Sequence, residues 1–344
     1  MQKRRTQQLS STHLVAEKGR FQTFLSVISF FLLLASLPLK ADTKAQTLKV
    51  VAITEIVAHP SLQQAKAGIL QELKRAGFEV GKNLKLIEEN AQGSIANANL
   101  IAKRFIGLKP DLIIAISTPS AQAVRSAAKG TSIPIVFSSV SDPVGAGLIE
   151  SLEQVPTQIT GAMDGPSLTE MQALLKTLVP KVKTLGLLYN GGEANSAKTI
   201  ASLKSLIDSN IKLVESSVPS SNMVPEAMRM LVQKVDAIYI PSDNTVFSAL
   251  PKVIQIAKEQ KIPLLSSDPD SVRLGVFACY GYTQLAVGET AGAMAAKILQ
   301  GEKLSQLKVR TPAKADVFVN KKTAGNLGIA FPPRFHNVDI IIVE

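Results

Sequence analysis

Residues 109–124 read KPDLIIAISTPSAQAV, and residues 234–250 read KVDAIYIPSDNTVFSAL. Both stretches run from Lys-x-Asp through a short apolar strand and a turn of Ser, Thr and Pro into a helical segment. A strand that leads into a helix in this way is typical of a βαβ unit with a parallel sheet. Because the same unit occurs once in each half of the chain, we expect two lobes of similar architecture.

The same alternation extends outward from both stretches. Apolar strand-like runs alternate with helical segments from LKVVAIT (48–54) to IPIVFSS (133–139). A second series runs from ITGAM (159–163) to GVFACYGY (275–282), and it includes a long predicted helix, NTVFSALPKVIQIAKEQ (244–260). This order predicts an α/β fold of two Rossmann-like lobes with parallel open sheets and a hinge between them.

The predicted lobes exchange segments near the end of the chain. We assign residues 48–158 plus 283–312 to an N-terminal lobe, and residues 159–282 plus 313–344 to a C-terminal lobe. A chain of 344 residues is long enough for two such cores.

The first 41 residues are predicted to be an export signal. Residues 24–39 read FLSVISFFLLLASLPL, an uncharged run that Lys and Arg residues precede and Ala41 follows. The alternative is an uncleaved membrane anchor, but Pro38 ends the run before the roughly 18 residues that a spanning helix needs. No cysteine stands directly after the run, so we expect a periplasmic protein without a lipid anchor or stable membrane insertion.

Charge and cysteine content exclude several classes of protein. The net charge is +11, and much of it comes from the signal segment. The remaining basic residues are scattered over predicted helix faces with no aromatic residues between them, which argues against nucleic-acid binding. Cys279 is the only cysteine and lies in an apolar run, so we expect a buried, inert thiol.

Short polar residues follow the predicted strands, where the next helix begins. Ligands of open parallel sheets bind at the carboxyl ends of the strands, and free amides at helix starts favour anions. The same residue types are common helix N-caps, so capping is the alternative at each position. The residues are Ser117, Thr118, Ser120, Ser138, Ser139, Ser141, Asp142, Tyr189, Asn190, Asn195, Ser242, Asp243, Asn244, Ser266, Ser267 and Asp268.

The charges in this set indicate the kind of ligand. Asp142, Asp243 and Asp268 stand beside the turns, but no Lys or Arg does. A zwitterion suits such a site, since hydroxyls and amides hold its carboxylate and an Asp holds its ammonium. The four tyrosines also lie near strand ends, where a ring can stack on the ligand, although core packing explains Tyr239 equally well.

One glycine turn is close to a nucleotide-binding motif. Residues 189–199 read YNGGEANSAKT, which differs from a Walker A loop because Ala197 stands where a glycine is needed. We interpret the turn instead as one that places Tyr189, Asn190 and Asn195 at the cleft.

Catalytic and metal-binding motifs are missing from the sequence. It contains no Gly-x-Ser-x-Gly, His-Glu-x-x-His or Gly-x-Gly-x-x-Gly. Of three histidines, only His59 lies close to a predicted strand end. We predict no catalytic residue, metal or cofactor; a pair of carboxylates remains an open alternative, although no pair stands out.

Five blocks together resemble the TrpX-like family of ABC-transporter substrate-binding proteins. The resemblance runs in order over about residues 48–330. The blocks are EIVAHPSLQQAKAGILQELKRAGFEVGKNL (55–84), ISTPSAQAV (116–124), PIVFSSVSDPVGAGLI (134–149), LGLLYNGGEANS (185–196) and VDAIYIPSDNTVFSALP (235–251).

The resemblance implies a type I periplasmic-binding-protein fold that closes on a solute by a hinge. It also implies binding of an aromatic amino acid such as tryptophan, and partnership with an ABC permease and its ATPase. The chain departs from the family at Gln63, which replaces an acid and leaves the role of His59 open. The family's ligand contacts match Thr118, Ser139, Asp142, Asn190, Asp243 and Asn244.

Within that site, we expect Thr118 and Ser139 to hold a carboxylate and Asp243 to hold an ammonium. Tyr189 or His59 then faces the ligand's side chain. The main hypothesis is therefore a monomeric solute-capture protein. A ligand sensor for a membrane receptor and a two-lobed transferase are the alternatives.

Overall fold

The protein is described by a computed structural model that covers residues 47–165, 167–336 and 338–344. Residues Thr47–Glu344 form one compact unit. The predicted signal segment, residues 1–41, lies outside the described residues.

The first sheet has five parallel strands in the order β2-β1-β3-β4-β5. All five residues of β3 and all six of β4 are buried, as expected of central parallel strands that helices cover on both faces. The strands are β1 (Lys49–Glu55), β2 (Leu84–Asn90), β3 (Leu112–Ile116), β4 (Ile135–Val140) and β5 (Ile159–Met163).

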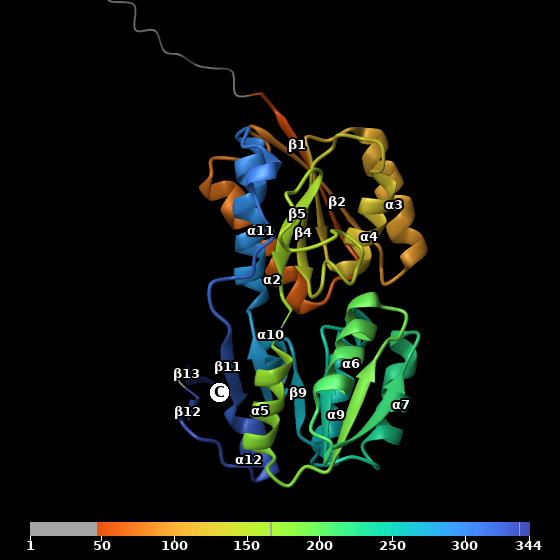
Figure 1. The fold of residues 1–344 in the computed structure, drawn as a ribbon, viewed down its shortest axis with the longest axis vertical. Coiled ribbons are helices and arrows are strands. Elements are labelled where there is room, and N and C mark those ends of the chain that lie inside the picture. The colour runs from red at the N-terminus through yellow and green to blue at the C-terminus, as the bar shows by residue number, and fades with distance from the viewer. Residues whose placement is uncertain (1–46, 166, 337) are drawn as a thin grey trace, which may run out of the picture. The chain divides into compact units, whose positions relative to one another are not determined.

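Two pairs of helices cover this sheet (Figure 1). Helices α3 (Ile95–Leu108) and α4 (Thr118–Ala127) pack together, and helix α2 (Pro60–Arg75) packs against α11 (Gln284–Leu299). The start of α2 follows from Pro60, whose fixed φ suits the first turn of a helix. Helix α11 thus returns to the first sheet from far along the sequence.

Small residues let α2 and α11 approach each other closely. A Cβ atom added to Gly288 would lie 1.9 Å from the carbonyl oxygen of Ala65, and one added to Gly68 would lie 2.4 Å from that of Leu285. Both distances are far inside van der Waals contact, so only glycine fits at these two crossing points.

The second sheet has eight strands in the order β12-β13-β11-β10-β9-β8-β6-β7. Strand β10 pairs antiparallel with β11, and β12 pairs antiparallel with β13; the other pairs are parallel. The strands are β6 (Thr184–Tyr189), β7 (Lys212–Ser217), β8 (Ala237–Ile240), β9 (Leu264–Ser266), β10 (Ala278–Gly281), β11 (Asp316–Asn320), β12 (Arg334–Phe335) and β13 (Val338–Val343).

Alternate residues of β8 enter different parts of the second core. Tyr239 packs with residues of two helices, α5 (Leu168–Leu178) and α6 (Ala194–Leu206). Ile238 and Ile240 pack with the residues of other helices, because neighbouring side chains of a strand point to opposite faces. Those helices are α7 (Val224–Leu231), α8 (Asn244–Ser248), α9 (Leu250–Glu259) and α10 (Pro269–Leu274). The short helix α12 (Lys321–Leu327) contributes Ala324 to a third cluster.

The predicted two-lobed α/β fold is confirmed, but one predicted boundary is wrong. The prediction began the second lobe at residue 159, whereas β5 belongs to the first sheet, where Ile159 pairs with Ile135. An apolar strand fits the edge of either sheet, so its sequence does not show which sheet it joins. The second lobe begins after Met163.

The helix predicted over residues 244–260 is also divided. Helix α8 ends at Ser248 and α9 begins at Leu250, with Ala249 between them. Pro251 lies in the first turn of α9, and proline has no N–H to continue the hydrogen bonds of a preceding helix. The break leaves α8 as a separate short element beside the carboxyl end of β8.

Candidate functional site

A small buried cavity of about 20 Å³ lies at the carboxyl ends of strands from both sheets. This volume holds about one water molecule, so an amino acid enters only when the lining side chains move apart. Three groups of residues form it: one from the first lobe, one from the second, and one beside the chain crossings. They are His59, Ser61, Leu62, Ser117 and Ser139; Asn195, Ser242, Asn244, Phe247 and Asp268; and Asp164 and Gln284.

Two buried carboxylates line this cavity. Asp268 caps α10 by accepting a hydrogen bond from the backbone N–H of Asp270 at 3.1 Å, and the hydroxyl of Ser61 donates to it from α2. Asp164 follows β5 and accepts from Gln284 Nε2 at 2.9 Å. No Lys or Arg is found among the described residues that line the cavity. The site therefore has an excess of acidic groups that a cationic ligand group would balance.

Burial makes both carboxyl groups weaker acids. Burial, and then repulsion by Asp270, raises the pKa of Asp268 to about 7. Burial also raises the pKa of Asp164, against the opposing effect of its hydrogen bonds. An ammonium group placed beside either carboxylate would favour the charged form and lower its pKa again.

Two buried polar atoms at the cavity have no hydrogen-bond partner among the described residues. They are His59 Nδ1 and Asn195 Oδ1, on side chains of residues that are each 5% exposed. The other polar atoms of these side chains are occupied: Asn195 Nδ2 donates to the carbonyl of Ser242 at 2.5 Å, and His59 Nε2 lies 3.4 Å from Asn244 Oδ1. Leaving a buried polar atom unpaired costs about 1–3 kcal/mol, so both atoms are suited to meet a ligand.

One wall of the cavity is aromatic and apolar. The rings of His59 and Phe247 meet edge to face, with centroids 5.6 Å apart and an interplanar angle of 66°. Leu62 lies beside them in the lining. The wall therefore suits an aromatic side chain, while the carboxylates suit an ammonium group.

The backbone is strained at two serines of the cavity. Ser117 has φ of 80° and Ser139 has φ of 57°, in a region that residues other than glycine seldom occupy. Such strain is held in place by surrounding structure and collects at ligand sites. Here it turns two hydroxyl-bearing residues toward the cavity at the ends of β3 and β4.

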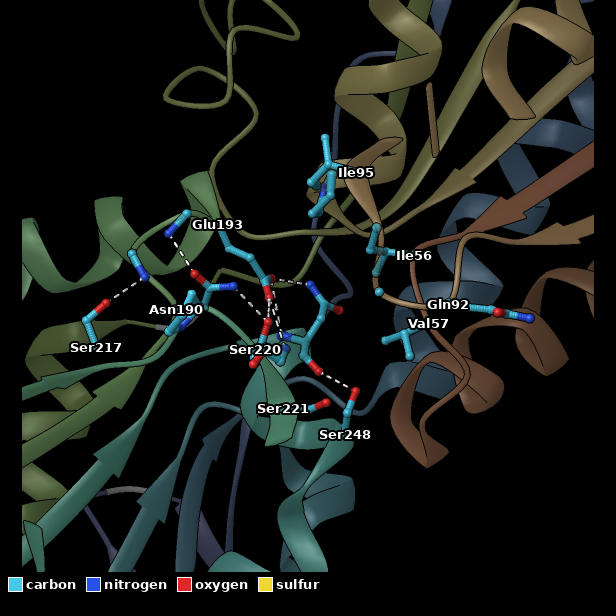
Figure 2. Close-up of a pocket in the computed structure, with 17 residues that line it drawn as sticks. Ile56, Val57, Gln92, Ile95, Asn190, Glu193, Ser217, Ser220, Ser221 and Ser248 are labelled. Atoms are coloured by element: carbon cyan, nitrogen blue, oxygen red, sulfur yellow. Dashed lines mark hydrogen bonds between the residues drawn. The ribbon is translucent and has the colours of Figure 1, made fainter. Parts of the chain in front are cut away.

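A larger cavity of about 590 Å³ lies next to the buried one (Figure 2). Ile56, Val57 and Ile95 of the first lobe line it, and Asn190 and Glu193 of the second lobe lie across from them. Asn244 lines both cavities. The two cavities therefore adjoin at Asn244.

The structure brings five of the nine predicted ligand residues to these cavities. His59, Ser139, Asn195 and Asn244 line the buried cavity, and Asn190 and Asn244 line the larger one.

Asp243, predicted to hold the ammonium, lies outside the cavity. It is fully buried and caps α8 through a 2.8 Å bond from the N–H of Val246. Its other oxygen accepts from the N–H of Asn190 and the hydroxyl of Ser196, both at 2.6 Å. Its acceptor sites are used within its own lobe, as expected of a capping residue.

Three further predicted residues also lie outside both linings. Thr118 is buried in the first turn of α4, and Asp142 accepts a hydrogen bond from the N–H of Gly145 at 2.8 Å. The Tyr189 hydroxyl donates to Glu215 Oε2 at 2.8 Å. Burial, and then Glu215, raises the pKa of Tyr189 to about 12. The side chains of Asp142 and Tyr189 thus hydrogen-bond to residues of their own lobes.

Several lining residues were absent from the predicted ligand set. Asp268, Ser117 and Ser242 did belong to the wider group of polar strand-end residues. Asp164 and Gln284 stand where the chain crosses between the sheets, and no local pattern marks that position. The residues missed altogether are Ser61, Leu62, Asp164, Phe247 and Gln284.

Cys279 is buried, as predicted, and burial raises the pKa of its thiol well above the usual range. No group of three or more His, Cys, Asp and Glu side chains in the described part of the chain is placed to hold a metal ion. In residues 47–344, apart from positions 166 and 337, no helix combines the length and apolarity needed to cross a bilayer.

Two α/β lobes with a polar cavity at their strand ends define a two-lobed solute-binding protein. The chain belongs to the ABC transporter substrate binding protein family, which it matches over residues 50–337. It is 39% identical over 285 residues to a tyrosine-binding protein of Clostridioides difficile, covering 83% of this chain and 81% of that one.

Two solved structures extend the comparison. An ABC domain in complex with L-Trp from Streptococcus pneumonia is 29% identical, with a TM-score of 0.80 over 86% of this chain and 100% of that one. The ligand-free, open structure of a substrate binding protein from Clostridium difficile is 38% identical, with a TM-score of 0.63 over the same shares. The resemblance to substrate-binding proteins inferred from the five sequence blocks is thereby confirmed.

Proposed function

We propose that this protein captures an aromatic amino acid outside the cytoplasmic membrane and delivers it to an ABC permease and its ATPase. The observation that carries the proposal is the buried cavity, in which two carboxylates, two unpaired polar atoms and an aromatic wall meet. The printed names of a tyrosine-binding relative and an L-Trp complex support the ligand class. The basic and apolar pattern of residues 1–41 supports export.

In the proposed bound state, Asp268 and Asp164 hold the ammonium group. The Ser117 hydroxyl, which accepts from Asn244, lies nearby to donate to the carboxylate. Ser139 joins it once its hydroxyl turns away from Gln284 Oε1, to which it donates at 2.6 Å. The ligand ring packs against Phe247. Both charged groups of a free amino acid then have a partner. A purely anionic solute has no ammonium group to pair with the two carboxylates.

We propose that ligand binding and closure are coupled through contacts between the lobes. In the described structure, Ser61 donates to Asp268 and Asn244 Nδ2 donates to Ser117 Oγ at 3.1 Å. The higher TM-score belongs to the L-Trp complex despite its lower identity, which agrees with a closed arrangement. A ligand that touches both lobes favours that arrangement, because its contacts are incomplete when the lobes separate.

Aromatic amino acids are expected to stabilise the mature protein. L-Tyrosine or L-tryptophan at a hundredfold excess over Kd should raise the free energy of unfolding by about 2.7 kcal/mol. Thermal melting of the purified chain measures this as a rise in Tm of several degrees. L-Glutamate, whose extra carboxylate would face Asp164 and Asp268, should leave Tm unchanged. If none of the natural amino acids raises Tm, the proposed ligand class is wrong.

Binding is expected to release protons below about pH 7. The raised pKa of Asp268 leaves this carboxyl largely protonated in acid, and the ligand's ammonium requires it charged. Affinity should therefore weaken by up to about tenfold per pH unit as the pH falls from 7 to 5. The titratable groups that face Asp268 are Asp270, Asp164 and Cys279.

Calorimetry at pH 6 in two buffers of different ionisation enthalpy measures the released protons. The number of protons released on binding should fall in Asp268→Asn, because the asparagine side chain does not titrate. An affinity that stays constant between pH 5 and 8 would contradict an ammonium contact at Asp268.

A further inference from the structure

A chain of hydrogen bonds runs from Glu193 through Asn244 to His59. Glu193 is 6% exposed, and the hydrogen bonds to its carboxylate come from N–H and O–H donors on Asn244 and Thr245 (Figure 2). One of these donors is Asn244 Nδ2, which lies 2.5 Å from Glu193 Oε2. Because a carboxylate only accepts, this contact identifies the NH₂ end of the Asn244 amide.

The orientation of Asn244 fixes the proton on His59. The second N–H of Asn244 Nδ2 is used by Ser117 Oγ at 3.1 Å, so the amide oxygen is the atom that faces His59 Nε2 at 3.4 Å. An amide oxygen only accepts, and Nε2 must therefore carry the hydrogen. Burial lowers the pKa of His59 to about 4, against the opposing effect of Asn244, so the ring is neutral at pH 7. A neutral imidazole has one N–H, which leaves Nδ1 as a bare acceptor.

His59 lines the cavity, and its bare nitrogen has no hydrogen-bond partner among the described residues. Asp164 and Asp268 are stronger partners for an ammonium, because hydrogen bonds between charged groups are shorter and stronger. The ring of His59 instead stands edge to face with Phe247, beside Leu62, in the wall that suits the ligand's side chain. A donor at the end of that side chain is the group that Nδ1 is placed to meet.

We infer that His59 selects ligands whose aromatic side chain carries a hydrogen-bond donor, a phenol O–H or an indole N–H, over phenylalanine. This inference rests on the proposed function. Glu193 is a positioning residue: it touches no ligand but sets the amide of Asn244, which sets the tautomer of His59. A site that hydrogen-bonds such a group disfavours the analogue without it, because Nδ1 then stays buried and unpaired.

The first test compares L-tyrosine with L-phenylalanine, which differ by one hydroxyl. The wild-type protein should bind tyrosine at least about tenfold more tightly by calorimetry. In His59→Phe, which keeps an aromatic ring beside Phe247, the two affinities should come within about threefold. An unchanged preference in this variant overturns the inference, and Tm of the free variant shows whether it is folded. If neither amino acid binds the wild-type protein, the proposed function fails instead.

The second test reads the tautomer directly and needs no ligand. Bare and protonated ring nitrogens differ widely in ¹⁵N chemical shift, and His336→Gln identifies the resonances of the other histidine in the described chain. The free wild-type protein at pH 7 should show His59 with Nε2 protonated and Nδ1 bare. A protonated Nδ1 would overturn the inference, whatever the ligand proves to be.

The role of Glu193 is tested by Glu193→Gln in both measurements. The new amide N–H would face Asn244 Nδ2, so Asn244 should turn over and present its NH₂ group to His59. The His59 proton should then move to Nδ1, and the preference for tyrosine should fall with it. A purely structural role would lower Tm and leave both the tautomer and the preference unchanged, which would remove Glu193 from the inference.

Discussion

Asp268→Asn is expected to weaken binding of an aromatic amino acid by about 100-fold. Asparagine caps helices as well as aspartate: its amide oxygen can accept from the N–H of Asp270, and its NH₂ group can donate to the Ser61 hydroxyl, so the local structure should persist. The variant loses the negative charge that faces the ligand's ammonium, and a hydrogen bond to a charged group contributes about 1.5–3 kcal/mol. Calorimetry at pH 8, where Asp268 is ionised, measures the change in Kd.

Asp243→Asn is the matched control, because Asp243 is also a buried N-cap. Its carboxylate bonds only within its own lobe, so the substitution should lower Tm and change Kd by less than about threefold. If binding were instead lost in Asp243→Asn and kept in Asp268→Asn, Asp243 would be the residue that holds the ammonium, as the sequence indicated.

Gly288→Ala is expected to destabilise the protein by about 3 kcal/mol. The added Cβ would lie 1.9 Å from the carbonyl oxygen of Ala65, so α2 and α11 must separate along their contact. Overpacking of a close contact typically costs 1–3 kcal/mol, and here the atom in the way is rigid backbone. Chemical denaturation measures the free energy of unfolding, and thermal melting should show a Tm lower by roughly 6 °C or more.

Gly107→Ala is the control for this effect. Gly107 lies in helix α3, and a Cβ added there meets nothing within 4 Å. Alanine is the better helix former by about 0.5–1 kcal/mol, so this variant should be slightly more stable than the wild type. A Gly288→Ala variant as stable as Gly107→Ala would contradict the prediction, because the added methyl group would then cost nothing at the contact with α2.

The sequence predicts the fold well because the relevant signals are local. Apolar runs such as LIIAI (112–116) have the length and composition of a buried strand, and the Pro and Ser residues that follow them mark helix starts. The sequence does not predict that β5 joins the first sheet, because strand pairing depends on residues that lie far apart in the chain. The end of the helix at Ser248 is not predicted, because the apolar pattern continues through Pro251 and proline is also common in the first turn of a helix.

The candidate site is only partly predictable for a related physical reason. Asp243 and Asp268 each follow a strand, cap a helix and are buried, so they look alike in sequence. Only the three-dimensional arrangement shows that Asp268 meets Ser61 of the other lobe, whereas Asp243 is enclosed by Asn190 and Ser196. Capping and ligand binding use the same side chains, and the sequence does not separate them.

The return of α11 to the first sheet sets an order for folding. Strands β1 to β5 are complete early in the chain, but α11 is made only after β10. Until then, the face of α2 that carries Gly68 and Ala65 has no partner, and an apolar surface stays exposed to water. The first lobe should therefore finish folding after most of the second lobe's chain has emerged, and a fragment that ends at Met163 should aggregate instead of folding.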